Sequence, residues 1–134
     1  MRNTEFELDT RGRRVIDITD EVARFVADGG LSGLVHVFVP HATAGLALME
    51  TGAGSESDLE ETLERLLPRD DRYGHRHGSV GHGGDHLLPV LVPPSLVLEA
   101  DAGRIVLGTW QRIVVVDPNR ENNVRRVRVA VLEG

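Results

Sequence analysis

Histidine is the residue type best suited to chemistry in this chain, and most of its histidines lie in one short segment. Of the six histidines, four occur between Asp71 and Pro89, namely His75, His77, His82 and His86. Neutral imidazole is the commonest protein ligand for metals, and histidine also transfers protons near neutral pH. The same segment holds five glycines and few apolar side chains. A metal or catalytic site, a tag-like run and a solvated loop therefore remain alternative interpretations.

The spacing within this segment does not match a structural zinc motif. The run Y-G-H-R-H-G-S-V-G-H-G-G-D-H contains no cysteine and no H-E-x-x-H helix. Asp85, directly before His86, offers an oxygen as a direct or outer-sphere metal partner. We interpret His77 and His82 as bystanders in the solvated part of the loop.

A second candidate, His41, follows a strand in which Val35, Val37 and Val39 alternate onto one face. Continued alternation places His41 on that same face. The small residues 42–45 come next, which lets a ligand approach the backbone, and Thr43 among them offers a hydroxyl. The structural alternative is a histidine whose hydrogen bonds are satisfied at a strand end.

Three further polar residues follow predicted elements. Glu50 ends a short strand-like run, and Asp58 lies in the first turn of a predicted helix, where an acid also favours the helix dipole. Gln111 follows Trp110 on a predicted strand and could orient a substrate, whereas the tryptophan itself is expected in the core.

Composition excludes several kinds of chemistry. All 15 basic residues are arginine, so neither a Schiff-base lysine nor the lysine of a Walker-type phosphate loop is available. The absence of cysteine excludes a thiolate nucleophile and fits a cytoplasmic location. The formal charge is -6 without a dense basic stripe, which argues against a nucleic-acid partner. No apolar run is long enough to span a membrane or to form a secretory signal.

The 134 residues fit one domain, 1–134, with a core of valine, leucine, isoleucine and alanine because aromatic residues make up only 4%. Turn and capping signals predict a helix that begins near Thr19 as N-cap and stops at Gly29-Gly30. A second helix is predicted from the Ser57 capping box to Pro68. Strands are predicted at 5–9, 13–18, 33–40, 46–50, 87–92, 96–100, 104–107, 110–117 and 124–132. This order indicates an α+β protein, an antiparallel β-sandwich with two helices.

These pieces together resemble the YjbQ-like family, also called the secondary thiamine-phosphate synthase family. The resemblance rests on H-A-T-A-G with Glu50, on Asp58, on Y-G-H, on D-H and on L-G-T-W-Q, in that order between about residues 35 and 117. The sequence departs from the family pattern in three places. Met49 stands where an asparagine often precedes the glutamate. A lysine-containing run after D-H is replaced by Leu87-Leu88-Pro89, and a D-G-P-R element by Asp117-Pro118-Asn119-Arg120.

The resemblance implies a homotrimer of a small α+β fold with a cleft built around His41 and His86. It implies that Glu50 and Asp58 support catalysis, and that His75 joins His41 and His86 as a candidate ligand of a divalent metal, zinc or magnesium. Thr43, Gln111 and Arg120 are then the expected substrate contacts. The implied reaction joins a pyrimidine pyrophosphate to a thiazole phosphate, giving thiamine phosphate.

Three hypotheses follow: an enzyme acting on a phosphorylated small molecule, a non-catalytic module that binds a metal or metabolite, and a trimeric scaffold. The convergence of His, Asp, Glu and Gln on strand and loop ends favours a site over a scaffold. The sequence does not separate catalysis from binding.

Overall fold

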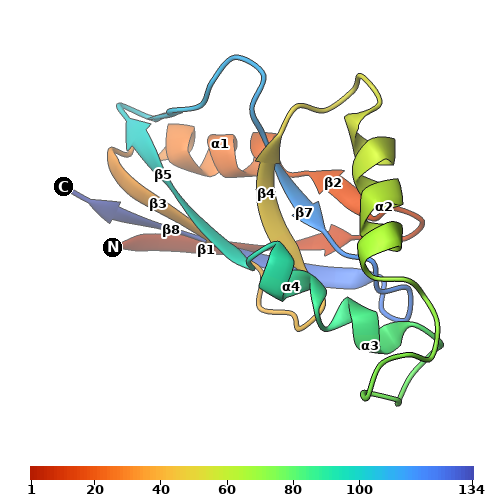
Figure 1. Cartoon of the computed structure of the whole chain (residues 1–134). Coiled ribbons are helices and arrows are strands. Elements are labelled where there is room, and N and C mark those ends of the chain that lie inside the picture. Colours follow the sequence, from red (N-terminus) through yellow and green to blue (C-terminus); the bar gives the residue numbers. More distant parts are fainter.

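The computed structural model describes the whole chain, residues 1–134, as twelve elements (Figure 1). In chain order they are β1 (Arg2–Asp9), β2 (Val15–Asp17), α1 (Thr19–Asp28), β3 (Gly33–Phe38), β4 (Gly45–Met49), α2 (Ser55–Leu66), α3 (His82–Asp85), α4 (Leu88–Leu91), β5 (Ser95–Asp101), β6 (Arg104–Ile105), β7 (Arg112–Val116) and β8 (Val124–Glu133). None of the helices has the length and apolar character needed to cross a membrane.

The strands form two antiparallel sheets, which confirms the predicted α+β class. The larger sheet has the order β1-β8-β3-β5-β6, and the smaller has the order β2-β7-β4. In the larger sheet β3 pairs with both β8 and β5, so that Val35 lies beside Val131 on one side and Leu98 on the other. In the smaller sheet Gly45 of β4 pairs with Val116 of β7, and Met49 pairs with Arg112.

Alternation along the strands builds the main core. Val127, Val129 and Val131 of β8 are buried, whereas the residues between them face outward or are only partly covered. The same core takes Ile113 and Val115 from β7 and the apolar stripe of α1. The two sheets and α1 thus enclose one apolar cluster, with α1 packed against β6 and β7.

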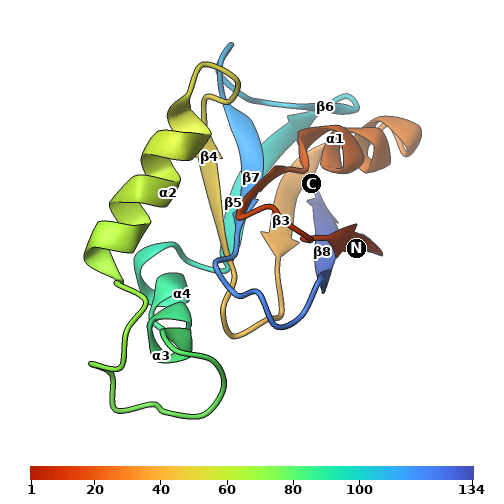
Figure 2. The same ribbon diagram turned by 90° about the vertical axis from the view of Figure 1, so that its right-hand side faces the viewer.

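The strand β7 is apolar on both faces because both faces are covered. Its other pair, Val114 and Val116, packs with Leu88 and with the leucines of α2. Helices α2 and α1 accordingly lie on opposite sides of the smaller sheet (Figure 2). Helix α2 has no buried residue, whereas Thr19, Val22 and Val26 of α1 are buried.

Four local predictions were wrong. Residues 87–92 are not a strand: α4 spans Leu88–Leu91, with a proline in its first turn, a position that tolerates proline because its N–H has no partner there. Helix α2 begins at Ser55 after the left-handed Gly54, so Ser57 lies inside the helix and caps nothing.

The other two errors concern Thr19 and Trp110. The N-cap of α1 is Ile18, and the Thr19 hydroxyl instead accepts the Ile113 N–H at 2.8 Å, which ties α1 to β7. Strand β7 begins only at Arg112, and Trp110 in the preceding loop is 71% exposed rather than in the core.

Candidate functional site

Helix α3 holds two of the clustered histidines. His82 begins this short helix and His86 follows its last residue. Residues four apart lie on the same face of a helix. Their Nε2 atoms are hydrogen-bonded at 2.9 Å. His82 is buried, which contradicts its interpretation as a solvated bystander.

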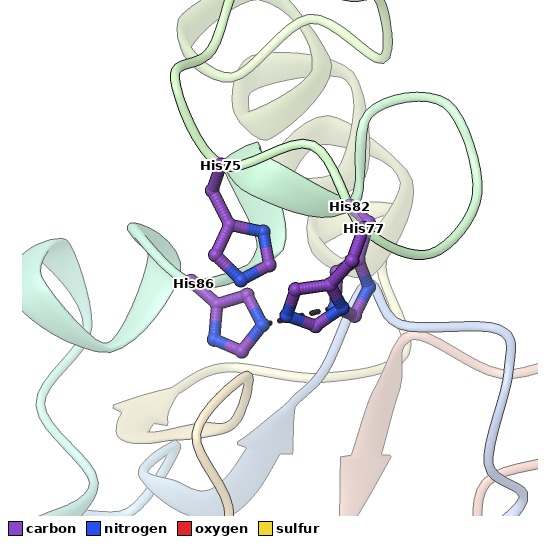
Figure 3. A group of neighbouring side chains, drawn as sticks. All are labelled: His75, His77, His82 and His86. Atoms are coloured by element: carbon purple, nitrogen blue, oxygen red, sulfur yellow. Dashed lines mark hydrogen bonds between the residues drawn. The ribbon is translucent and has the colours of Figure 1, made fainter.

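The loop between α2 and α3 brings the other two histidines onto this pair. The ring centroids of His75 and His86 lie 4.4 Å apart, and those of His77 and His82 lie 5.2 Å apart. All four rings turn toward one another (Figure 3). One nitrogen of each ring lies within 4.8 Å of a nitrogen of every other ring. We call His75, His77, His82 and His86 the histidine cluster.

Two glycines allow this loop to lie against α3. Gly81 has a φ of +86°, in the left-handed region that favours glycine. A Cβ on Gly83 would lie 2.7 Å from the carbonyl oxygen of His75 and 2.6 Å from the Cβ of Tyr73. Tyr73 is itself held because its hydroxyl donates to the Pro68 carbonyl at 2.6 Å. The glycines thus permit the close packing that carries His75 to the cluster.

Charged side chains anchor α3 and the loop from outside the cluster. The buried Asp85 accepts two hydrogen bonds from Arg69, at 2.5 and 3.3 Å. This two-point contact joins α3 to the segment that follows α2. Glu121 accepts the Ser79 N–H at 2.5 Å, and that contact holds the loop and lowers the pKa of Glu121 below its usual range.

A buried amide sets the proton positions in the cluster. Asn119 accepts the Glu121 N–H with Oδ1 at 2.9 Å, which leaves Nδ2 to donate to Nδ1 of His82 at 3.1 Å. His82 then carries its proton on Nε2 and donates it to Nε2 of His86. A metal on Nε2 of His82 would move this proton to Nδ1. There, carboxylate oxygens of Glu121 and Asp85 lie 3.7 and 3.9 Å away.

The cluster also disfavours protonation of His75. Desolvation lowers the pKa of His75 below its ordinary value, and the charges that His77, His86 and His82 would carry lower it further. Neutral His75 has a free lone pair, as a metal ligand requires.

The donor set fits zinc or a similar transition metal. Zinc is bound tetrahedrally by imidazole nitrogens about 2.0–2.1 Å from the ion, which places the nitrogens about 3.4 Å apart. The four nitrogens already lie within 4.8 Å of one another, so small side-chain movements would complete such a shell. Magnesium prefers oxygen ligands, and the cluster supplies only nitrogen.

His41 lies in a second polar group rather than in the histidine cluster. It follows β3, and its Nε2 accepts the backbone N–H of Arg126 at 2.9 Å. Burial and the positive charges of Arg125 and Arg126 lower the pKa of His41, although Asp117 opposes them. Within the single chain, His41 is therefore a strand-end histidine whose Nε2 already has a hydrogen-bond partner.

Asp117 is the centre of this second group. It is buried, pairs with the buried Arg125, and accepts hydrogen bonds from Thr43 Oγ1 at 3.0 Å and from the Asn119 N–H at 2.9 Å. Because Asn119 also contacts His82, a continuous set of hydrogen bonds joins the second group to the histidine cluster.

The remaining predicted site residues lie elsewhere. Glu50 follows β4 at the end opposite Thr43, and Asp58 is an exposed residue of the first turns of α2. Gln111 accepts the Gly108 N–H at 2.8 Å in an exposed turn. Arg120 is exposed directly after Asn119, beside the polar group.

Several residues of these two groups were not identified from the sequence. For two of them, a pattern in the sequence could have identified them. Arg125 shares the alternation of Val127, Val129 and Val131, so it had to point inward and find a buried acid. The i, i+4 spacing of His82 and His86 predicts one helical face, but the intervening glycines disfavour a helix. Asn119 and His77 carried no local signal.

Comparison with known proteins agrees with this fold. The family model described as UPF0047 protein YjbQ-like matches residues 4–134. The chain belongs to the YjbQ-like family. Among YjbQ-like relatives, UPF0047 protein Rv2556c of Mycobacterium tuberculosis is 56% identical over 128 residues, covering 96% of each chain. UPF0047 protein YjbQ of Escherichia coli O157:H7 is 30% identical over 130 residues, covering 95% of this chain and 94% of that one.

Solved structures of similar proteins share the architecture. The hypothetical protein APE1520 from Aeropyrum pernix K1 superposes with a TM-score of 0.88 at 30% identity over the full length of both chains. The conserved hypothetical protein TT1486 from Thermus thermophilus gives a TM-score of 0.83 at 33% identity, covering 96% of this chain and 99% of that one. The YjbQ-like fold is thus shared over the whole chain.

Proposed function

We propose that this protein is a small-molecule enzyme whose histidine cluster binds a divalent transition metal, zinc above all. The observation that carries the proposal is the placement of four imidazole nitrogens within 4.8 Å of one another. A metal there would act as a Lewis acid toward a phosphoryl or pyrophosphoryl oxygen of the substrate. The reaction that we propose is the one implied by the family resemblance, which joins a pyrimidine pyrophosphate to a thiazole phosphate and releases pyrophosphate.

The chain's own residues have separable tasks in this proposal. The buried His82 and the half-buried His86 would hold the metal together with the exposed His75 and His77, with His77 as the fourth ligand. The carboxylates of Glu121 and Asp85 would accept the Nδ1 proton of metal-bound His82, as outer-sphere partners do for metal-bound histidines generally. Asp117 holds Asn119 in place rather than touching substrate.

The test is zinc binding and activity measured on the same tag-free protein. We expect about one zinc per chain by elemental analysis, and thiamine-phosphate formation that stops with chelator and returns with zinc. His86→Ala should weaken zinc binding about 100-fold or more, since it removes a ligand, and loss of even an outer-sphere partner typically costs 10–100-fold. His36→Ala is the matched control, because His36 stacks beside Phe38 on the larger sheet, away from the cluster. Equal zinc loss in both variants would contradict the proposal.

The second candidate function is a non-catalytic metal-binding module, and the number of ligands favours it. Four protein ligands fill a tetrahedral shell, as in structural zinc sites, whereas catalytic sites keep one position open. The exposed His77 decides between the two. If His77→Ala keeps zinc and activity, the fourth position is available to substrate. If zinc is lost with His77 and no precursor is turned over, the module is the better description.

We also propose that the chain forms a homotrimer, the number coming from the family resemblance. An outward apolar strip on the larger sheet supports self-association. Leu34 and Leu132 are neighbours on paired strands there, 47% and 60% exposed, and Val97 on β5 is 58% exposed. Light scattering should give three times the 14.7 kDa chain mass. A Leu132→Glu variant should shift that mass downward.

A further inference from the structure

Beside the histidine cluster lies a wholly polar hollow that is open to solvent. It has a volume of about 300 Å³ and no hydrophobic residue lines it. Its walls come from the turn between β1 and β2 and from the segment between β7 and β8. The lining includes Thr10, Arg13, Arg14, Asn119, Arg120 and Asn123. Ligand sites are more often lined by apolar side chains, so this composition points to a small, highly polar ligand.

The charges around the hollow favour an anion. Arg13 and Arg120 form no ion pair, and the Arg13 guanidinium donates only to the backbone carbonyl of Asp9. Arg14 pairs with Glu64 at 2.7 Å on the outer side. The one acid in the lining, Asp117, is already neutralised by Arg125. Two arginines are thus left without a carboxylate.

One residue joins this hollow to the histidine cluster. Asn119 is buried, lines the hollow, and donates to His82. A ligand seated among Arg13, Arg14 and Arg120 therefore lies one side chain away from the cluster. We propose that this hollow is an anion subsite that binds a phosphate or pyrophosphate group of the substrate through Arg13 and Arg120. The assignment to the substrate rests on the proposed function, whereas anion binding itself does not.

Arginine is the residue that suits this task. Its planar guanidinium donates two parallel hydrogen bonds to a phosphate, and such charge-assisted bonds are about twice as strong as neutral ones. In a chain without lysine, arginine is also the only permanent side-chain cation. The two free arginines come from segments far apart in the sequence, so the fold, and not a local motif, creates the site.

The experiment is calorimetric titration of inorganic phosphate and pyrophosphate into tag-free protein, metal-free and zinc-loaded. Pyrophosphate should bind the metal-free protein, and Arg13→Gln and Arg120→Gln should each weaken it about tenfold or more, the usual cost of a hydrogen bond to a charged group. Arg120→Lys should recover only part, since an ammonium cannot form the two-point contact. Zinc content should be unchanged in all of these variants.

Arg11→Gln is the matched control. Arg11 lies in the same turn and loses the same charge, but its side chain does not line the hollow. If Arg11→Gln weakened pyrophosphate binding equally, the effect would come from the overall charge of the protein, and the subsite would be overturned. Binding that needs zinc and ignores both arginines would place the anion on the metal and overturn the subsite too, as would an absence of binding at millimolar pyrophosphate. A protein that binds pyrophosphate through these arginines but binds no zinc would keep the subsite and refute the proposed metal enzyme.

Discussion

Each end of the smaller sheet carries an acidic residue beside another polar residue, but only one of the two ends buries them. Because β4 and β7 are antiparallel, Thr43 and Asp117 meet at one end, and Glu50 and Gln111 meet at the other. At the first end Asp117 and Thr43 are buried and hydrogen-bonded to each other, and they connect through Asn119 to the histidine cluster. At the second end Glu50 and Gln111 are exposed, and the glutamine bonds only within its own turn.

The difference in burial shows at which end the polar side chains are fixed by contacts within the chain. Buried polar groups must find partners, and fully connected networks hold their members in a single arrangement. No buried side-chain polar atom is left without a partner in this structure. The polar side chains at the Asp117 end are therefore fixed by hydrogen bonds within one chain. At the Glu50 end, water can replace the hydrogen bonds of the exposed side chains.

The largest effect should come from breaking the buried pair at the first end. Arg125→Met leaves the Asp117 carboxylate buried without its cation, and such losses cost about 3–5 kcal/mol of unfolding free energy. Urea unfolding of the metal-free protein measures this. Adding Asp117→Asn should recover part of the loss, because the amide removes the charge but can still accept from Thr43. If Arg125→Met alone were as stable as the wild type, the buried pair would not stabilise the first end more than the exposed residues stabilise the second.

A substitution in the loop should separate the cluster from the rest of the fold. Gly83→Ala places a Cβ against the His75 carbonyl and Tyr73, so the loop must move and carry His75 away. We expect zinc affinity to fall about 10–100-fold, by comparison with lost outer-sphere contacts, with little change in urea stability of the apo protein.

The matched control is Gly74→Ala, in the same loop, where an added Cβ meets nothing within 4 Å. It should keep zinc affinity within about twofold, because an ordinary surface substitution changes the free energy by about 0.5 kcal/mol or less. Equal loss in both variants would mean that the loop does not hold His75 through this close packing.

The pH dependence of stability should be set by His41 at the first end and by His75 in the histidine cluster. The pKa values of His41 and His75 are both lowered in the folded protein, so the unfolded chain binds more protons below about pH 6.5. The stability of the apo protein should thus be complete above that pH and decrease as the pH falls below it. Urea midpoints at pH 7.5 and 5.5 would show the decrease, and His41→Gln should reduce it. A midpoint that rises on acidification would refute the assignment.

Much of the fold was predictable because alternation and helix stops are local signals. The strands around Val35 and Val127 and the end of α1 at Gly29 follow directly from residue order. The segment from residue 82 to 92 did not, since glycines and a proline hide two short helices that tertiary contacts stabilise. The site was harder to predict for a related reason: Asn119 reaches the histidine cluster only through His82, which lies far from it in the sequence.

The smallest effect should come from the exposed end. Gln111→Ala removes one hydrogen bond to the Gly108 N–H, which water can replace because the turn is exposed. Unfolding free energy should change by no more than about 0.5–1 kcal/mol, and zinc and pyrophosphate binding should stay as in the wild type. The informative result is activity. If turnover falls while both bindings hold, Gln111 contacts substrate as the family resemblance implies, and the two ends act together in the working enzyme. If zinc binding itself falls, the separation of the ends is wrong.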